Sequence, residues 1–411
     1  MINNNLLVKF AELAVKIGAN VQKDQYVFVN ATTETKELTR EIVRQAYLAG
    51  AKKVLVNWSD DFVTNYNYLY QTEQTLAEIP VWHIDKYKEF VNQGGCAITV
   101  VSPASGLNNE VDPKKLQTFN MAIRKNLTFY YDHMMGSKAQ WTIVAAPNKI
   151  WAKKVFPNMD EDKAVETLWD AILTASRVTE ENNPIHDWEK HNERILKHNQ
   201  ILNNYNFDTL HFKNSIGTDI SIKLVENHIW AGGGEHTPDG TMFNPNIPTE
   251  ENFTMPHKYG VNGKVVASKP LEYQDKLIED FWFEFKDGKV VNYDARVNKD
   301  ILENLLKFDE GSSYLGEIAL ISYDSPISNS GILFYNTLFD ENASCHMALG
   351  RAYTINVQKG TEMSLDELKA IGYNHSMSHS DFMFGTSDLQ VTGTTKNGKT
   401  VVIFKDGNFV I

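Results

Sequence analysis

Two adjacent carboxylates lie between two prolines in the segment NIPTEENFTMPH, residues 246–257. Proline fixes its own backbone angle and disfavours helix at the residue before it. Pro248 and Pro256 therefore place Glu250 and Glu251 on a constrained, extended segment. Surface loops rarely need acidic side chains on so rigid a backbone. The spacing indicates that this pair of glutamates takes part in chemistry.

A third carboxylate is predicted to be buried. In YLGEIALIS, residues 314–322, apolar side chains occupy both faces of a predicted strand that contains Glu317. A lone buried carboxylate is strongly unfavourable unless it is paired with a cation or binds a metal. For this strand considered by itself, an ion pair with a lysine or arginine elsewhere in the chain is the more common arrangement.

A histidine and an aspartate are predicted to point the same way near the C-terminus. In HSMSHSDFMFG, residues 375–385, His379 and Asp381 share one side of an extended segment, with their Cα atoms about 6.5–7 Å apart. Two groups at this spacing can clamp one cation between them. The pair His-x-Asp is also frequent by chance, so a polar loop is the competing interpretation.

A second histidine, His346, lies in the otherwise apolar stretch NASCHMALGRAYT, residues 342–354, with Tyr353 downstream. A solitary histidine in such a run is more often a satisfied core residue than a ligand. The adjacent Cys345 suggests a cysteine–histidine nucleophile. Neighbours on a strand face opposite ways, however, which predicts that Cys345 is a small buried hydrophobic residue.

Five of these residues, all of them in one half of the chain, together supply three carboxylates and two imidazoles. Zn²⁺, Co²⁺ and Mn²⁺ accept such a mixture, whereas Ca²⁺ and Mg²⁺ prefer oxygen ligands alone. Three carboxylates and one hydroxide balance two divalent ions, which predicts a dinuclear centre able to attack a carbonyl at pH 7. No H-E-x-x-H sequence is present, which excludes a single-zinc site of the thermolysin type. The set consists of Glu251, Glu317, His346, His379 and Asp381.

The first half of the chain alternates helical patterns with short apolar strands, predicted at 25–30, 51–58, 96–101 and 140–146. This alternation is typical of a Rossmann-like α/β domain, a largely parallel sheet with helices on both faces. No G-x-G-x-x-G or P-loop sequence accompanies it, so no nucleotide is predicted. Residues 1–205 are therefore expected to be a structural or lid-like domain.

After Tyr205 the pattern changes to alternating strands broken by Asn-Gly and Asp-Gly pairs, which are strong hairpin signals. We expect residues 206–411 to form an α+β domain, largely antiparallel β, with a helix at 299–308. All the candidate ligands fall in this half. It is therefore the predicted catalytic, metal-binding domain.

The composition of the 411 residues is that of a globular protein, with 42% hydrophobic and 22% charged residues and a net charge of −12. The acidic balance argues against nucleic acid or an anionic membrane as a partner. Two cysteines, far apart in the sequence, favour reduced thiols in the cytoplasm. No stretch of 18 apolar residues exists, and the N-terminus has no signal-peptide pattern.

The segment WAGGGEHTPDGTMFNPNIPTEENFTMPHK, residues 230–258, resembles the M29 metallo-aminopeptidases, the aminopeptidase T, aminopeptidase S and PepS group. SYLGEIAL, CHMALGRAY and HSDFM match the same family in sequence and spacing. The resemblance covers essentially the whole chain. Within the family, the chain is most similar to the PepS or aminopeptidase S branch of Gram-positive bacteria.

The resemblance implies metal-binding roles for the residues that match the family motifs. Glu251 would be a ligand and Glu317 the carboxylate shared by both metals, with Tyr353 at or beside one of them. Glu250 and Glu251 face opposite ways, so the one that does not ligate would be a general base or a support. In the expected mechanism, Glu250 is the catalytic residue that passes the proton to the leaving amine. Tyr353 would either ligate as a phenolate or stabilise the tetrahedral oxyanion. The remaining ligands implied by the family are His346, His379 and Asp381.

The family also implies a homodimer whose internal cavity is closed partly by the first domain. Activation by cobalt or zinc is expected, and the substrates would be peptides with a free N-terminus, with a broad preference for the first residue. The expected reaction is hydrolysis of the N-terminal peptide bond by a metal-bridging hydroxide.

Three other hypotheses compete with the aminopeptidase. A different dinuclear amidase or phosphoesterase is one; a phosphoesterase should have basic residues beside the acids, where only Lys258 qualifies. A glycosidase that uses Glu250 or Glu251 with Glu317 is another. The third is a metal-free protein whose acidic groove binds cationic peptides or amines.

Overall fold

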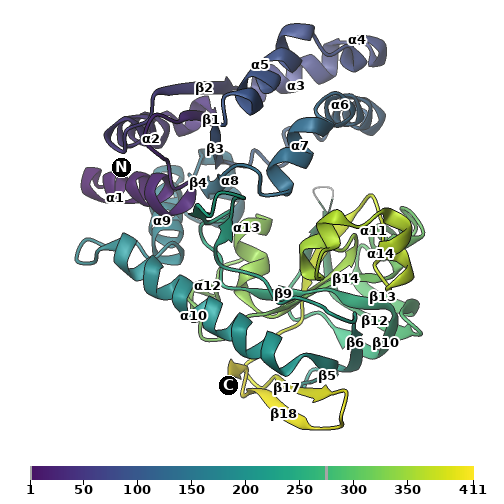
Figure 1. Ribbon diagram of the computed structural model, residues 1–411. Helices are drawn as coiled ribbons and strands as arrows, with labels where there is room; N and C mark the ends of the chain where they lie inside the picture. Colours follow the sequence, from purple (N-terminus) through teal and green to yellow (C-terminus); the bar gives the residue numbers. More distant parts are fainter. Residues whose placement is uncertain (1, 274–275) are drawn as a thin grey trace. The chain divides into compact units, whose positions relative to one another are not determined.

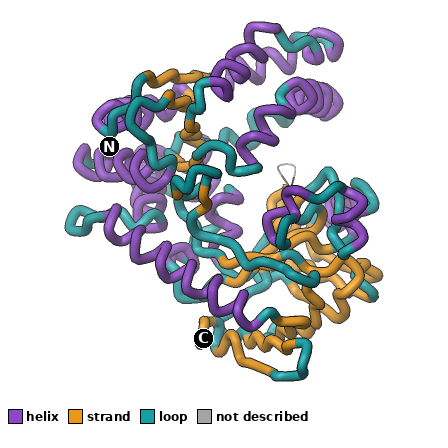
Figure 2. The backbone as a smooth tube through the Cα atoms, in the orientation of Figure 1, coloured by secondary structure: helices purple, strands orange, loops and turns teal. Residues whose placement is uncertain are grey.

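The structure, a computed structural model, describes residues 2–273 and 276–411 (Figures 1 and 2). The chain forms two compact units. The first consists of Met1–Lys190 together with Gly234–Pro248, and the second of His191–Gly233 together with Thr249–Ile411. The return of residues 234–248 to the first unit is a feature that the sequence patterns did not indicate. Within the described residues, no helix has the length and apolar character needed to cross a membrane.

The first unit is built on a parallel sheet with the strand order β2-β1-β3-β4. Both faces of its central strand are covered. Phe28 packs against Phe90 of a flanking helix with ring centroids 4.6 Å apart, while Val27 and Val29, which point the other way, are fully buried. This agrees with the predicted parallel sheet. The strands are β1 (Tyr26–Thr32), β2 (Lys53–Ser59), β3 (Cys96–Val101) and β4 (Trp141–Ala145).

The first unit also contains the helices α1 (Asn4–Leu13), α2 (Lys36–Leu48), α3 (Asp61–Tyr70), α4 (Glu73–Ala77), α5 (Val81–Asn92), α6 (Pro113–Asn126), α7 (Thr128–Met135), α8 (Lys149–Val155) and α9 (Glu161–Ala175). Of these, α3, α4 and α6 extend away from the sheet (Figures 1 and 2). Helix α10 (Pro184–Tyr205) begins in the first unit and ends in the second.

The segment that returns to the first unit carries a small hairpin, β7 (Glu235–His236) with β8 (Met242–Phe243). Its continuation pairs with β4. The amide of Ile143 donates to the carbonyl of Pro245 at 2.8 Å, and the amide of Ile247 donates to the carbonyl of Ile143 at 3.0 Å. The backbone just upstream of the two adjacent glutamates is therefore anchored by sheet hydrogen bonds.

The second unit contains a large antiparallel sheet with the order β11-β12-β10-β6-β5-β17-β18-β19, and β13 also pairs with β12. Asp287 and Gly288, with positive φ angles of 48° and 84°, join β12 to β13 in a hairpin, as the sequence predicted. The pair Asn262-Gly263, which the sequence also marked as a break between strands, instead lies within one strand and pairs with Ser221 and Ile220. The strands are β5 (Phe207–Lys213), β6 (Asp219–Leu224), β10 (Pro256–Val266), β11 (Leu271–Tyr273), β12 (Lys276–Lys286), β13 (Lys289–Val297), β17 (Gln390–Thr395), β18 (Thr400–Lys405) and β19 (Asn408–Phe409).

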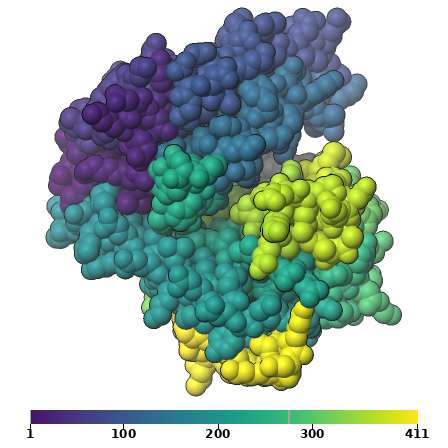
Figure 3. Space-filling model, in the orientation of Figure 1, coloured from purple at the N-terminus to yellow at the C-terminus, as the bar shows by residue number. Residues whose placement is uncertain are grey.

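The end of this sheet lies at the protein surface. The hairpin of β17 and β18 is visible there in the space-filling view (yellow in Figure 3), and the side chain of Val402 is 48% exposed. Within the described part of the second unit, the short helices are α11 (Lys299–Leu306), α12 (Pro326–Ser330), α13 (Thr337–Asp340) and α14 (Leu365–Ala370).

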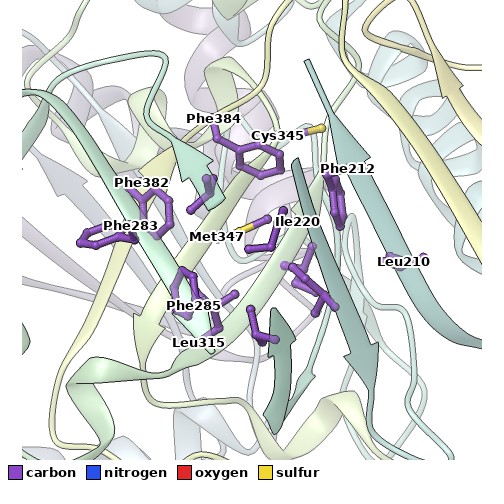
Figure 4. Close-up of a cluster of buried hydrophobic side chains, with 14 of the residues drawn as sticks. Leu210, Phe212, Ile220, Phe283, Phe285, Leu315, Cys345, Met347, Phe382 and Phe384 are labelled. Atoms are coloured by element: carbon purple, nitrogen blue, oxygen red, sulfur yellow. The ribbon is translucent and has the colours of Figure 1, made fainter. Parts of the chain in front are cut away.

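A smaller antiparallel sheet in the second unit has the order β16-β15-β14-β9. One of its faces belongs to the core that it shares with the larger sheet (Figure 4). Phe382 of the small sheet packs against Phe283 of β12 with ring centroids 5.1 Å apart, and Met347 lies in the same cluster. The strands are β9 (Asn252–Thr254), β14 (Leu315–Leu320), β15 (His346–Gly350) and β16 (His379–Met383).

One detail of β14 differs from the predicted alternation. Strict alternation would put Leu315 on the same face as Glu317, but Leu315 lies in the core with Ile318 and Leu320. The register of β14 against β15 shifts between Leu315 and Glu317, which marks a bulge at Gly316. The bulge lets Leu315 enter the core while Glu317 faces away from it.

Candidate metal centre

The face of the small sheet opposite the core carries four of the five predicted ligands. Glu317 and Asp381 both lie opposite Ala348 in the register, one on each neighbouring strand. Alanine is small, so two carboxylates can converge over it. His346 lies two residues before Ala348, and His379 lies two residues before Asp381. Because side chains alternate along a strand, both histidines lie on the same face as the two carboxylates.

Glu251 is the fifth predicted ligand and comes directly before β9. A Cβ added to Gly232 would lie 2.1 Å from the carbonyl oxygen of Glu251. Only glycine can occupy that position without moving the backbone, and the φ angle of Gly232, 127°, is itself one that other residues rarely adopt. The glycine run WAGGG thus has a packing role beside the ligand segment.

The five side chains form two groups that share Glu317. In the first, Nε2 of His346 lies 3.4 Å from Oε1 of Glu317 and 3.5 Å from Oε2 of Glu251. In the second, Nε2 of His379 lies 3.6 Å from Oε2 of Glu317 and 3.2 Å from Oδ1 of Asp381. Within each group the potential ligand atoms all lie within 4.8 Å of one another. Glu317 offers a different oxygen atom to each group.

The buried cluster carries more negative than positive charge, and this imbalance shifts the pKa values of its members. Burial, followed by the charges of Glu317 and Asp381, raises the pKa of Glu251 to about 8. Burial opposes a charge on His346, but its hydrogen bond to Glu317 and the surrounding acids together raise its pKa to about 9. The acids repel one another and draw protons onto the histidines. Such a donor set fits divalent cations, which would relieve this repulsion.

The ring of His379 is oriented by a backbone contact. Its Nδ1–H donates a hydrogen bond of 2.7 Å to the carbonyl oxygen of Arg351. A carbonyl can only accept, so Nδ1 carries the proton and Nε2 faces the acids. This is the arrangement that usually fixes a metal-ligating histidine. Burial again opposes the charge, but Asp381 and Glu317 raise the pKa of His379 to about 10.

Tyr353 lies beside the cluster. Its ring centroid is 4.9 Å from that of His379 and 6.2 Å from that of Phe253. Burial, followed by the charges of Glu317 and Asp381, raises the pKa of the Tyr353 phenol well above its usual value.

Glu250 points away from its neighbour, as an extended backbone requires. Its carboxylate lies 3.8 Å from Nε2 of His191 and 3.9 Å from the guanidinium of Arg194, both on α10. His191 also donates from Nε2 to the carbonyl of Thr249 at 2.7 Å. Because two side chains of α10 hold residues 249 and 250, the helix fixes the segment that presents Glu251.

The side-chain amide of Asn374 hydrogen-bonds to three backbone carbonyls near the cluster. Nδ2 of Asn374 donates to the carbonyl oxygens of Gly311, Tyr314 and Gly350 at 2.8, 3.2 and 2.6 Å. A Cβ added to Gly350 would lie 2.3 Å from the carbonyl oxygen of Ser378. The glycine in ALGRA therefore permits the close approach that places β15 beside the segment leading to His379.

Cys345 is a buried free thiol, as predicted. The amide of Ile321 donates to its sulfur, and its thiol donates to the carbonyl of Ile321, each at 3.3 Å. Burial raises the pKa of Cys345 to about 12. It has the properties of a core residue rather than of a nucleophile.

The sequence patterns missed three side chains near the cluster, namely His191, Arg194 and Glu341. The first two lie on a polar helix that seemed only to connect domains, so no local signal marked them. Glu341 follows α13, and burial together with the charges of Asp381, Glu251 and Glu317 raises its pKa well above the usual value. The pair Asp340-Glu341 was the available sequence signal.

Comparison with known proteins places these observations in a family. The model of a family described as thermophilic metalloprotease (M29) matches residues 3–409. Aminopeptidase AmpS of Bacillus subtilis is 44% identical over 97% of each chain. Aminopeptidase 2 of Geobacillus stearothermophilus is 41% identical over 98% of this chain and 97% of its own. The solved structure of AmpT from Thermus thermophilus superimposes with a TM-score of 0.92 at 33% identity and covers 99% of each chain.

Proposed function

The chain belongs to the M29 metalloprotease family and is a metallo-aminopeptidase, and we propose that it works with two divalent ions that share Glu317. One observation carries the dinuclear proposal. The two oxygens of Glu317 lie 3.4 and 3.6 Å from the ring nitrogens of two different histidines. A carboxylate in that position suits a bridge between two ions. The proposed ligands are Glu251, Glu317, His346, His379 and Asp381.

When bound, the ions would supply Lewis acidity toward the scissile carbonyl and a hydroxide held between them as the nucleophile. The same ligand set accepts Zn²⁺, Co²⁺ or Mn²⁺. The residues of the chain have to orient the substrate and stabilise the charge that develops on its carbonyl oxygen.

We assign Tyr353 to that second task. Its phenol lies against the ring of His379 and can donate a hydrogen bond to the developing oxyanion. In the alternative role, the phenolate would complete the ligand set of one ion.

Of the two roles open to Glu250, we propose the supporting one. Its carboxylate faces His191 and Arg194, and its backbone amide donates to Oδ1 of Asn342 at 2.8 Å. These contacts hold the backbone from which Glu251 reaches the cluster. A direct role of Glu250 as general base would require its side chain to leave this pocket.

We further propose a homodimer in the cytoplasm, with residues 1–205 covering the active site of the catalytic half, 206–411. No nucleic-acid or membrane partner is expected. These proposals rest on the family resemblance, on the acidic balance of the chain and on two buried, free cysteines.

The proposal is tested by hydrolysis of aminoacyl p-nitroanilides. The enzyme is first chelated and dialysed, and each metal is then added back separately. We expect no activity without metal, recovery with zinc or cobalt at two ions per chain, and cleavage of free-amine but not N-acetylated substrates. One bound ion per chain at full activity would contradict the dinuclear centre.

The same preparation separates the competing hypotheses. Anilide hydrolysis that survives chelation would contradict the metal-dependent mechanism, and a glycosidase would instead cleave p-nitrophenyl glycosides without metal. A chain that retains no metal after gentle purification, yet binds cationic peptides, would be a metal-free binding protein. Cleavage of N-acetylated substrates would indicate a dinuclear amidase that does not require a free amine.

A further inference from the structure

The two histidines of the cluster differ at the ring nitrogen that faces away from the acids. In His379, Nδ1–H donates a hydrogen bond of 2.7 Å to the carbonyl oxygen of Arg351. In His346, Nδ1 is buried, and no residue within 2–273 and 276–411 forms a hydrogen bond with it. The other nitrogen is placed alike in both rings, since each Nε2 lies 3.2–3.9 Å from an oxygen of Glu317 and of Asp381.

The acceptor of the His379 hydrogen bond belongs to a well-held stretch of backbone. The amide of Arg351 donates to the carbonyl of Ser378 at 2.7 Å, and the carbonyl of Gly350 accepts from Nδ2 of Asn374 at 2.6 Å. The carbonyl of Arg351 therefore has a fixed position. It holds His379 in the tautomer whose Nε2 lone pair is free to bind a metal.

The tautomer matters because a neutral imidazole that binds a metal through Nε2 must carry its proton on Nδ1. In His379 this proton is already paired with a carbonyl. In His346 it would be a buried N–H without an acceptor, which is unfavourable. An acceptor at this position also makes the imidazole a better ligand, and its loss usually lowers metal affinity by about 10–100-fold. Metal binding should therefore be weaker at the group that contains His346.

The carboxylates of the two groups differ in the same direction. Asp381 lies two residues from His379 on β16, and every residue of that strand is paired with β15. These two ligands are preorganised, because their backbone cannot move without breaking the strand pairing. Glu251 lies outside the strands, directly before β9, and its segment has to be held by side chains of α10.

We propose that the two ions bind in order and with unequal affinity. The first ion binds at Glu317, His379 and Asp381, and the second binds about 10–100-fold more weakly at the group of Glu251, Glu317 and His346. The activity then follows the concentration of free metal over the range in which the second ion binds. This inference rests on the proposed dinuclear aminopeptidase and adds to it a regulation by metal availability.

The test measures metal binding directly. The chelated and dialysed parent is titrated with Zn²⁺ in competition with a chromogenic chelator, and separately with Co²⁺ while the visible absorption of the bound ion is recorded. We expect two ions per chain, with dissociation constants that differ by about 10–100-fold, and two successive changes in the cobalt spectrum. Hydrolysis of leucine p-nitroanilide should stay low at one ion per chain and rise as the second ion binds.

Ligand variants assign the two constants to the two groups. His346→Ala should bind one ion per chain with the tighter constant of the parent. His379→Ala should lose that constant and bind metal no more tightly than the weaker constant of the parent. His346→Gln and His379→Gln keep a polar side chain of similar length, and they decide the assignment if an alanine variant does not fold. His211→Ala, at an exposed pair with Asp219, is the matched control and should bind both ions as the parent does.

Two results would overturn the inference and leave the dinuclear centre standing. Equal affinities for the two ions in the parent would remove the order of binding. A tighter constant that survives in His379→Ala but not in His346→Ala would reverse the assignment. By contrast, a parent that binds fewer than two ions per chain, or that is fully active with one, would refute the proposed function on which the inference rests.

Discussion

Two sheets of this protein carry rows of polar side chains, and the rows differ in charge. In the parallel sheet of the first unit, Asn57 donates to Asn30 at 3.3 Å and Asn30 donates to Thr99 at 3.4 Å. Lys86 completes the row with a hydrogen bond of 2.9 Å to Asn57. Donors and acceptors alternate along this row, so each group finds a partner within the protein.

In the small antiparallel sheet of the second unit, the row consists of carboxylates and imidazoles. Three acids accumulate around two histidines, and the pKa values of Glu251, His346 and His379 are all raised. This row can be satisfied only by adding positive charge. The comparison teaches that polarity within a sheet does not by itself mark a site; an unbalanced charge does.

The largest expected effect comes from Glu317→Gln, which removes the charge that both groups share. Metal-assisted catalysis supplies several kcal/mol of transition-state stabilisation, so kcat/KM should decrease by about 10³-fold or more. In the presence of a chelator the same variant should unfold at a higher temperature than the parent, because one repelling charge is gone. Steady-state kinetics and thermal unfolding with and without zinc measure both effects. A variant with reduced stability in the chelator would contradict the picture of an over-acidic cluster.

A smaller effect is expected from His191→Ala, which removes a contact of α10 with the ligand segment. Supporting residues of this kind usually change metal affinity by about 10–100-fold. Metal affinity should therefore decrease within that range, as measured by competition with a chromogenic chelator. His186→Ala, on the same helix with an exposed side chain beside Glu189, is the control for loss of a histidine, and it should retain the affinity of the parent. An affinity unchanged in His191→Ala would show that α10 is not needed to present Glu251.

The neutral row of the parallel sheet is tested by Asn30→Asp, which places a carboxylate between Asn57 and Thr99. The donated hydrogen bond to Thr99 is lost, and we expect a decrease in unfolding free energy of about 1–3 kcal/mol. Unlike changes in the cluster, this loss should be the same with zinc and with a chelator. Chemical denaturation under both conditions measures it. Rescue of the variant by zinc would mean that the first sheet also tolerates a metal site.

The smallest effect is expected from Lys307→Met, which breaks the exposed pair with Glu303 on α11. Exposed pairs contribute about 0–1 kcal/mol, so the unfolding free energy should change by no more than that. Activity and metal content should equal those of the parent. A change in metal affinity would indicate that surface charge, rather than the cluster, controls metal binding.

Much of the architecture could be predicted because it follows from local patterns. Alternating helices and apolar runs predicted the parallel sheet, and Asn-Gly and Asp-Gly pairs predicted hairpins of the larger sheet. The family was also recognisable from the motifs and is confirmed by the match over residues 3–409. Gly316 is an exception, since its bulge moved Leu315 into the core against simple alternation.

Sequence alone determined which way neighbouring side chains point. Glu250 and Glu251 diverge, and His379 and Asp381 converge, because an extended backbone alternates with a period of two. The partners of each side chain were decided only by the tertiary structure. Long-range pairing placed Glu317 and Asp381 opposite Ala348, put His191 of α10 against Thr249, and brought Glu341 to a cavity beside the cluster. Local geometry specifies direction, whereas distance across the fold depends on which strands and helices pack together.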